Sequence, residues 1–267
     1  MPHQPKLLAL PVCFALACSL ATDLSGLNGA DASSEAAPPD SSASDMAVEA
    51  AGFDAGFDVN DGADGSSAVV SNVQIGPLAF VANGGTVSPT LTTPSSNGTL
   101  LVATVTCDLT TATVGAPSGW SLAISGTGFA NGSSIWYANK GGLSSATFTS
   151  SNGGAVAAQI SEWSGVTNID QTGTALTPSA TTSVSVSTNG ALTAGGELAI
   201  TAFGQATGQQ SLITYTPSAG WTALGATGNT RMHYTADYRI GVGPGTVNET
   251  VTSSAAATWV AVIATFK

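Results

Sequence analysis

Few residues of this chain could do nucleophilic or acid–base chemistry. Beyond residues 1–17 only one histidine, His233, is left. Asp237 follows it by four positions, which on an extended strand separates the two side chains by roughly 13 Å, too far for a Ser-His-Asp arrangement. No Gly-x-Ser-x-Gly elbow precedes a helix. We therefore interpret His233 as a surface histidine, and no catalytic residue is assigned.

Glycoside hydrolysis would need a pair of carboxylates instead. The carboxylates that could supply the pair are Glu162, Asp170, Glu197, Asp237 and Glu249. Glu162 is the most pointed candidate, because Trp163 beside it could serve as a platform for a sugar ring. The favoured alternative is that Glu162 lies at a strand end and accepts hydrogen bonds from turn amides.

The sequence gives little support for a metal or cofactor site. One histidine and one cysteine cannot make a zinc site, and no glycine-rich phosphate loop occurs. An EF-hand calcium loop is excluded, because Gly62 stands where that loop needs a ligand. Calcium could therefore be bound only by carboxylates and turn carbonyls elsewhere. Cys13 falls in the leader, and Cys107 is interpreted as a small buried hydrophobe. We expect no cofactor and no metal.

The aromatic residues suggest a binding surface. Flat aromatic faces stack on sugar rings, and five tryptophans occur in the chain. Trp120 and Trp221 each follow a Pro-Ser turn and are expected in the core, as is Trp259 in the last strand. Trp136 and Trp163 are left as ligand contacts, together with Glu162. Because neighbours on a strand alternate, only one of Trp136 and Tyr137 can face the core. We expect Tyr137 to be that one, because Tyr234 in the second repeat also falls on the apolar side.

The N-terminal quarter of the chain is typical of an export leader and a tether. Residues 1–17 carry Lys6, a ten-residue apolar run and a small-x-small cleavage site, which predicts a signal peptide. Cys18 then predicts lipidation as in bacterial lipoproteins; the alternative is ordinary secretion. Residues 18–66 contain ten acidic and no basic residues, which predicts a disordered linker. We expect an outer-membrane-anchored lipoprotein, in contact with membrane only through the lipid, or a secreted protein.

The remaining residues, 67–267, read as strands in two internal repeats, about 68–170 and 171–267. Each repeat has a strand opening on glycine, a Pro-Ser turn before tryptophan, an aromatic strand and an apolar strand. One such sheet cannot bury its apolar face alone, so we expect one antiparallel, jelly-roll-like β-sandwich. Two independent domains are the alternative. This part is nearly neutral, with six acids and four bases, which argues against nucleic-acid binding.

Alternation predicts which side chains face the core. One apolar side should be formed by Leu100, Val102, Leu198, Ile200 and Ala202. Residues 231–240 should form a half-buried strand. Its apolar side is expected to hold Met232, Tyr234, Ala236, Tyr238 and Ile240, and its polar outer face Arg231, His233, Thr235, Asp237 and Arg239. Residues 259–266 are apolar on both faces and should be central.

The pattern across residues 98–170 resembles a known module. Its landmarks are Gly-Thr-Leu-Leu-Val-Ala, Pro-Ser-Gly-Trp, Trp-Tyr-Ala, Ile-Ser-Glu-Trp-Ser-Gly-Val and Ile-Asp. It is similar to a β-sandwich module of secreted and surface proteins of environmental bacteria, found there beside fibronectin-like and Ig-like modules. The resemblance implies fold and location, with no catalytic residues to carry over.

Three functions follow as expectations. The first is a non-catalytic surface module that binds polysaccharide or another envelope component. The second is a structural or adhesive display domain without a small-ligand site. The third is a glycan hydrolase. An exposed aromatic surface favours the first, and two carboxylates converging in a cleft favour the third.

Overall fold

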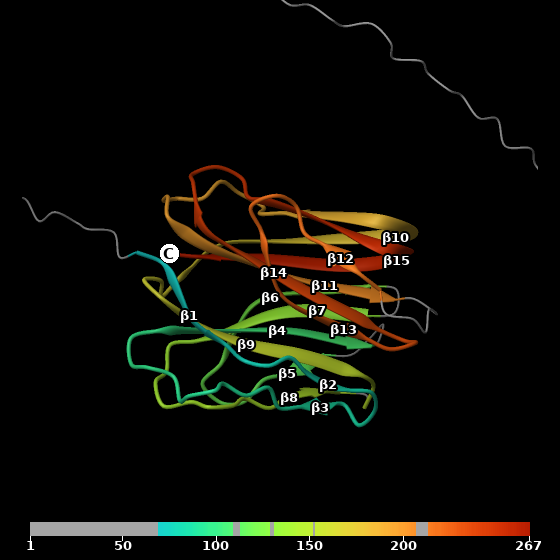
Figure 1. Ribbon diagram of the computed structural model, residues 1–267, viewed down its shortest axis with the longest axis horizontal. Coiled ribbons are helices and arrows are strands. Elements are labelled where there is room, and N and C mark those ends of the chain that lie inside the picture. The colour runs from blue at the N-terminus through green and yellow to red at the C-terminus, as the bar shows by residue number, and fades with distance from the viewer. Residues whose placement is uncertain (1–68, 109–112, 129–130, 152, 207–212) are drawn as a thin grey trace, which may run out of the picture. The chain divides into compact units, whose positions relative to one another are not determined.

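The described part of the chain is built from β-strands, as a composition rich in Thr and Val and poor in helix formers predicts. The computed structural model describes residues 69–108, 113–128, 131–151, 153–206 and 213–267, and these ranges hold fifteen strands and no helix (Figure 1). Within them, no helix is therefore long and apolar enough to cross a membrane. The predicted signal peptide, Cys18 and the acidic linker lie outside these ranges.

The first sheet takes all its strands from the first half of the described chain. In spatial order they are β1 (Ser71–Ile75), β9 (Val156–Ser164), β4 (Leu100–Asp108), β7 (Asn131–Ala138) and β6 (Ser121–Gly128). The short β2 (Ala79–Val81) also pairs with β9. All these pairs are antiparallel.

The second sheet repeats this order with strands of the second half. They are β10 (Ile169–Ser187), β15 (Asn248–Phe266), β11 (Glu197–Ala206), β14 (His233–Val242) and β13 (Thr222–Gly228). The two-residue β12 (Tyr215–Thr216) pairs with β15, and these pairs too are antiparallel. The expectation that residues 259–266 are central is confirmed, because β15 lies between β10 and β11.

The two halves can be compared position by position from their strand registers. Leu100 pairs with Trp163 in the first sheet, and Leu198 pairs with Phe266 in the second. Leu100 therefore corresponds to Leu198, and Trp163 to Phe266. This correspondence is used below to ask which features of one half the other half lacks.

A shared apolar core joins the two sheets. The residues predicted to face one side do so, and the core holds Leu100, Val102, Leu198, Ile200 and Ala202 together with Trp163 and Phe266. Across the same interface the hydroxyls of Thr104 and Tyr234 share a hydrogen bond of 2.6 Å. The predicted fold class, an all-β antiparallel sandwich, is confirmed; the jelly-roll connectivity stays a prediction.

Each large sheet is also covered on its other face. A small sheet of β3 (Thr86–Val87), β8 (Phe148–Ser150) and β5 (Val114–Gly115) packs on the first sheet (Figure 1). In the second half, residues 183–187 of β10 pair with residues 248–252 of β15, and β12 joins β15 there. This extension contributes Val184, Val186 and Val251 to a separate apolar core.

These covers overturn part of the expectation of a polar outer face on residues 231–240. Arg231 and Arg239 are exposed as expected, but the three polar residues between them are buried. His233, Thr235 and Asp237 are only 3%, 2% and 1% exposed. The apolar side chains pack inward as predicted from position 232 to 238, whereas Ile240 is 38% exposed. On the opposite face, Asp237 interacts through charge with Glu249 of the β15 extension. His233 is therefore a buried histidine, not a surface one.

Candidate functional site

A cleft opens on the outer face of the first sheet, where β6 and β7 meet the small sheet. It encloses about 130 Å³. The side chains and backbone that line it are Cys107, Thr113, Val114, Leu122, Ser125, Gly126, Thr127, Gly132, Ser133, Ser134 and Trp136. A cavity of about 150 Å³ accepts benzene, so this one has room for about one six-membered ring.

Trp136 is the predicted binding residue that the structure places in this cleft. Its strand neighbour Tyr137 points into the core between the sheets, so alternation turns the indole to the outer face. The indole Nε1–H donates to the Ser134 hydroxyl at 3.0 Å, which fixes the ring along β7. Its centroid lies 6.4 Å from that of Phe148 in the small sheet. The ring is half-buried and held in place before any ligand arrives.

Small residues leave room for the cleft. Cys107, Val114 and Gly132 correspond by register to Gln205, Tyr215 and His233 in the second half. The second-half side chains are larger at all three positions.

The larger side chains of the second half bond to one another. The Tyr215 hydroxyl donates to Gln205 Oε1 at 2.8 Å, and Gln205 Nε2 donates to the Ser253 hydroxyl at 3.2 Å and to the Ala255 carbonyl at 3.0 Å. These groups occupy the places that Cys107, Val114 and Ser150 hold in the first half. The residue types of the first half are therefore what keeps its cleft open.

The chemistry of the cleft is neutral and hydroxyl-bearing. Ser125, Thr127 and Ser134 offer hydroxyls, while Leu122, 47% exposed, extends the apolar surface beside Trp136. Burial raises the pKa of the Cys107 thiol to about 11, so it carries no charge near neutrality. Among the described residues that line the cleft none is charged.

Trp163 does not lie at the surface, and the expectation that it could offer a ligand platform is wrong. It is fully buried between the sheets, and its indole N–H donates to the Ser161 hydroxyl at 2.8 Å. Its ring packs on Tyr238 of the second sheet. The adjacent Glu162 was expected from the sequence to be either a ligand contact or an acceptor of turn amides.

Glu162 is also fully buried and serves the second of these roles. Its Oε1 accepts the Ser96 amide and the Thr99 hydroxyl, both at 2.7 Å, and its Oε2 accepts the Gln74 side-chain amide. Burial alone would raise the pKa of Glu162, but these hydrogen bonds outweigh it and lower the pKa below its ordinary value. The carboxylate thus ties the segment before β4 to β9 and β1, and it is not part of the Trp136 cleft.

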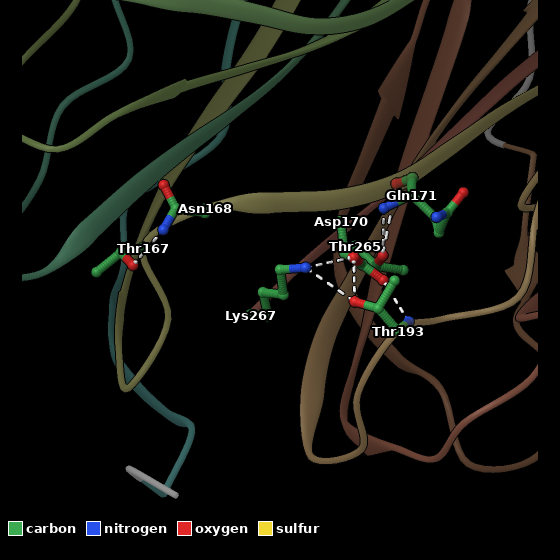
Figure 2. Close-up of polar contacts among 7 residues, drawn as sticks. All are labelled: Thr167, Asn168, Asp170, Gln171, Thr193, Thr265 and Lys267. Carbon is green, nitrogen blue, oxygen red and sulfur yellow. Dashed lines mark hydrogen bonds and ion pairs between the residues drawn. The ribbon is translucent and has the colours of Figure 1, made fainter.

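The equivalent place in the second half holds a different set of polar groups (Figure 2). Asp170 Oδ1 and Oδ2 accept the Thr193 hydroxyl and amide, and Lys267 Nζ donates to Asp170 Oδ1 and to the Thr193 hydroxyl, both at 2.8 Å. Burial opposes ionisation of Asp170, but Lys267 and Thr193 lower its pKa far below the ordinary value. Like Glu162, Asp170 fastens the segment before a central strand, here β11.

Glu197 lies beside Asp170 and next to a second cavity, of about 200 Å³. Its side chain is 1% exposed. Burial, and then the charge of Asp170, raise the pKa of Glu197 above its ordinary value. By register Glu197 corresponds to Thr99 and Thr265 to Glu162, so carboxylate and threonine have exchanged places between the halves.

The described residues hold no group of three or more metal-ligating side chains. Comparison with protein families, with curated proteins and with solved structures finds no significant match. The Trp136 cleft is therefore defined by its own geometry. The sequence identified Trp136 by alternation and by the analogy of Tyr137 with Tyr234. It did not identify the other lining residues Ser125, Thr127, Val114 and Cys107, because sequence spacing does not reveal which strand of the small sheet lies over β6 and β7.

Proposed function

We propose that residues 69–267 are a non-catalytic binding module for a neutral, hydroxyl-rich ligand, a polysaccharide or another envelope component, held in the Trp136 cleft. The observation that supports this most is the pairing of a fixed half-buried indole with three hydroxyls in an uncharged cleft of ring size. The C–H face of a sugar ring stacks on an aromatic face, and the sugar hydroxyls exchange water for protein hydroxyls.

The alternatives have less support. A hydrolase would need a pair of carboxylates at the ligand, yet none of the five candidate carboxylates lines this cleft. Glu162, Asp237 and Glu249 are at most 1% exposed. Glu197 lines the second cavity, but its neighbour Asp170 is held by Thr193 and Lys267. The burial of Trp163 favours the hypothesis of a display domain without a ligand site, because it removes one candidate ligand platform. The display-domain hypothesis does not explain why the Trp136 indole and the exposed Leu122 flank an open cleft.

We propose further that the module is exported. Residues 1–17 would be the signal, Cys18 the lipidated N-terminus and residues 18–66 the spacer that holds the module away from the membrane. This proposal is supported by the apolar run before Cys18 and by the acidic, Ala/Ser-rich composition after it. Mass spectrometry of the mature protein tests it, and an intact Met1 would contradict it.

The binding proposal is tested on an array of neutral and acidic glycans, followed by titration calorimetry with the strongest glycan. Trp136→Ala should weaken that binding at least about tenfold, which corresponds to about 1.4 kcal/mol. A matched pair controls for general surface effects: Leu122 and Leu176 are 47% and 51% exposed, but only Leu122 lines the cleft. Leu122→Ala should weaken binding and Leu176→Ala should not. Equal effects of the two, or no glycan bound at all, would argue against the site.

A further inference from the structure

Two carboxyl groups in the second half are buried where the first half has no charge. Asp237 on β14 is 1% exposed and Glu249 on β15 is fully buried. By register they correspond to Trp136 and Ala146 of the first half. The same strand order is therefore built without acids at these positions, so the carboxyl pair is not a requirement of the fold.

The two carboxyls differ in what they contact. Glu249 Oε1 accepts the Ser218 amide at 2.9 Å, and Glu249 Oε2 accepts the Ser218 hydroxyl at 2.5 Å. Neither oxygen of Asp237 accepts a hydrogen bond from the described residues. An ionised carboxylate without partners is costly to bury, and a neighbouring carboxylate adds repulsion. Burial, and then the charge of Glu249, raise the pKa of Asp237 to about 7.

The surroundings of the pair supply little compensation. From β15 comes Glu249 itself, whose pKa is raised by burial although Ser218 and the charge of Arg239 oppose this. β14 carries His233 and the exposed Arg239 on the same face as Asp237. On its other face it carries Tyr234, which interacts with Asp237 only through charge. The residues paired with Asp237 on β11 and β13 are the uncharged Thr201 and Ala223.

The turn at residues 217–221 is fastened to β15 at Asn248 and Glu249. Ser218 is held by Glu249, and the Trp221 indole N–H donates to the Asn248 carbonyl at 3.2 Å. Any force that displaces the Glu249 carboxylate acts first on its bonds to Ser218, because the turn is the exposed side of the contact, with Ala219 and Gly220 at the surface.

We propose that Asp237 is a proton-binding group that makes this turn respond to pH: protonated Asp237 leaves Glu249 free to hold Ser218, and loss of the proton sets two buried carboxylates against each other and loosens the turn. This goes beyond the proposed ligand site, which lies in the other half. A carboxyl whose pKa is higher in the folded than in the unfolded state stabilises the fold when it is protonated. This stabilisation is fully present below the unfolded-state pKa and is lost as pH rises through the folded-state pKa. For Asp237 that window runs from 3.8 to about 7.

The test is hydrogen exchange of the full chain on either side of neutrality, at about pH 5.5 and about pH 8.5, corrected for intrinsic rates. The opening of the turn at residues 217–221 should increase by up to about thirtyfold at the higher pH. The window of Asp237 extends from pH 5.5 to about 7 in this range, and each pH unit corresponds to about a factor of ten. The equivalent turn at residues 117–120 is an internal control and should show no such excess. Asp237→Asn should remove the excess from the second turn. Equal behaviour of the two turns, or an excess that survives Asp237→Asn, overturns the proposal.

A second measurement does not depend on the Asp237→Asn variant. Infrared spectroscopy of the native protein should show a protonated carboxyl band at about pH 5.5 that is lost as pH rises through about 7. Glu249→Gln, which keeps an acceptor for Ser218, should move that loss to lower pH. The absence of the band overturns the proposal. If millimolar calcium chloride alone tightens the turn at high pH in the wild type, the pair holds a cation and not a proton, which also overturns it.

Discussion

The ring of Trp163 in the first sheet lies 4.9 Å, centroid to centroid, from the ring of Tyr238 in the second. The contact is reciprocated, because Tyr137 of the first sheet lies 5.9 Å from Phe266 of the second. By register Trp163 corresponds to Phe266 and Tyr137 to Tyr238. Reciprocal contacts of this kind are what a twofold relation between two like halves produces. The central core is therefore an interface between the halves.

Trp163 should consequently be a stability residue. Trp163→Ala removes a fully buried indole from the core between the sheets and should cost about 3–5 kcal/mol of unfolding free energy. Denaturant unfolding measures it. Trp136→Ala is the comparison, since its half-buried ring lies outside that core and its loss should cost less. Similar costs for the two variants would contradict the distinction between a core tryptophan and a site tryptophan.

The first half should not fold alone. A chain of residues 69–168 keeps the apolar core beneath the small sheet, but it exposes Leu100, Val102, Ile135 and Trp163 on the opposite face. We expect no cooperative thermal transition for this fragment. Mixing it with residues 169–267 should restore one, because each fragment covers the other. A cooperative transition of either fragment by itself would show instead that the halves are independent domains.

Asp170 should support stability near neutrality and lose this contribution in acid. Its pKa is lowered in the folded state, so its contribution is fully present above the ordinary value of 3.8 and is lost as pH falls through the lower folded-state pKa. Asp170→Asn should therefore lower the thermal midpoint near neutrality and make it less sensitive to acid below about pH 4. Thr193 and Lys267 would keep partners at the amide oxygen, so folding should survive. An unchanged acid profile would rule out this role for Asp170.

Alternation along the strands predicted which side chains of β4 and β11 face the core between the sheets. It did not predict which segments cover the outward sides of these strands. Period-2 patterns state only which residues share a face. The cover of the first sheet is made of strands two or three residues long, such as β3 and β5, which are too short to carry a pattern. The cover of the second is a continuation of β10 and β15, each nineteen residues long. His233 and Asp237 were assigned to open surface for this reason. Trp163 was not, because it lies on the inward side of β9, in the core between the sheets.

The buried polar groups were missed for the same reason. Asp237 and Glu249 look solvent-facing when one face of each sheet is taken as exposed. Glu249 lies on a segment of β15 that continues past the main sheet and pairs with β10, and it interacts with Asp237 of β14 through charge. The single cleft residue found in advance, Trp136, was found because alternation lets only one of Trp136 and Tyr137 face the core, and Tyr234 of the second repeat favoured Tyr137. That argument needs no knowledge of the cover.

The second half suggests how to close the Trp136 cleft without disturbing the fold. Tyr215 and Gln205 bond to each other and to Ser253 where the first half has Val114, Cys107 and Ser150. The double variant Val114→Tyr with Cys107→Gln brings in both partners, and a serine already stands at position 150 to meet them. Unfolding free energy should stay within about 1 kcal/mol of the parent, because the new polar atoms have partners.

Glycan binding by this double variant should nevertheless fall at least about tenfold, since the space beside Trp136 is filled. Titration calorimetry with the strongest array glycan measures it, and circular dichroism with denaturant unfolding checks the fold. The single variant Val114→Tyr is the control for the new hydrogen bond. Its tyrosine hydroxyl lacks a glutamine partner, so this variant should be less stable than the double variant. Full glycan affinity in a folded double variant would mean that the ligand binds outside the cleft, and Trp136 would then be a packing residue for Phe148.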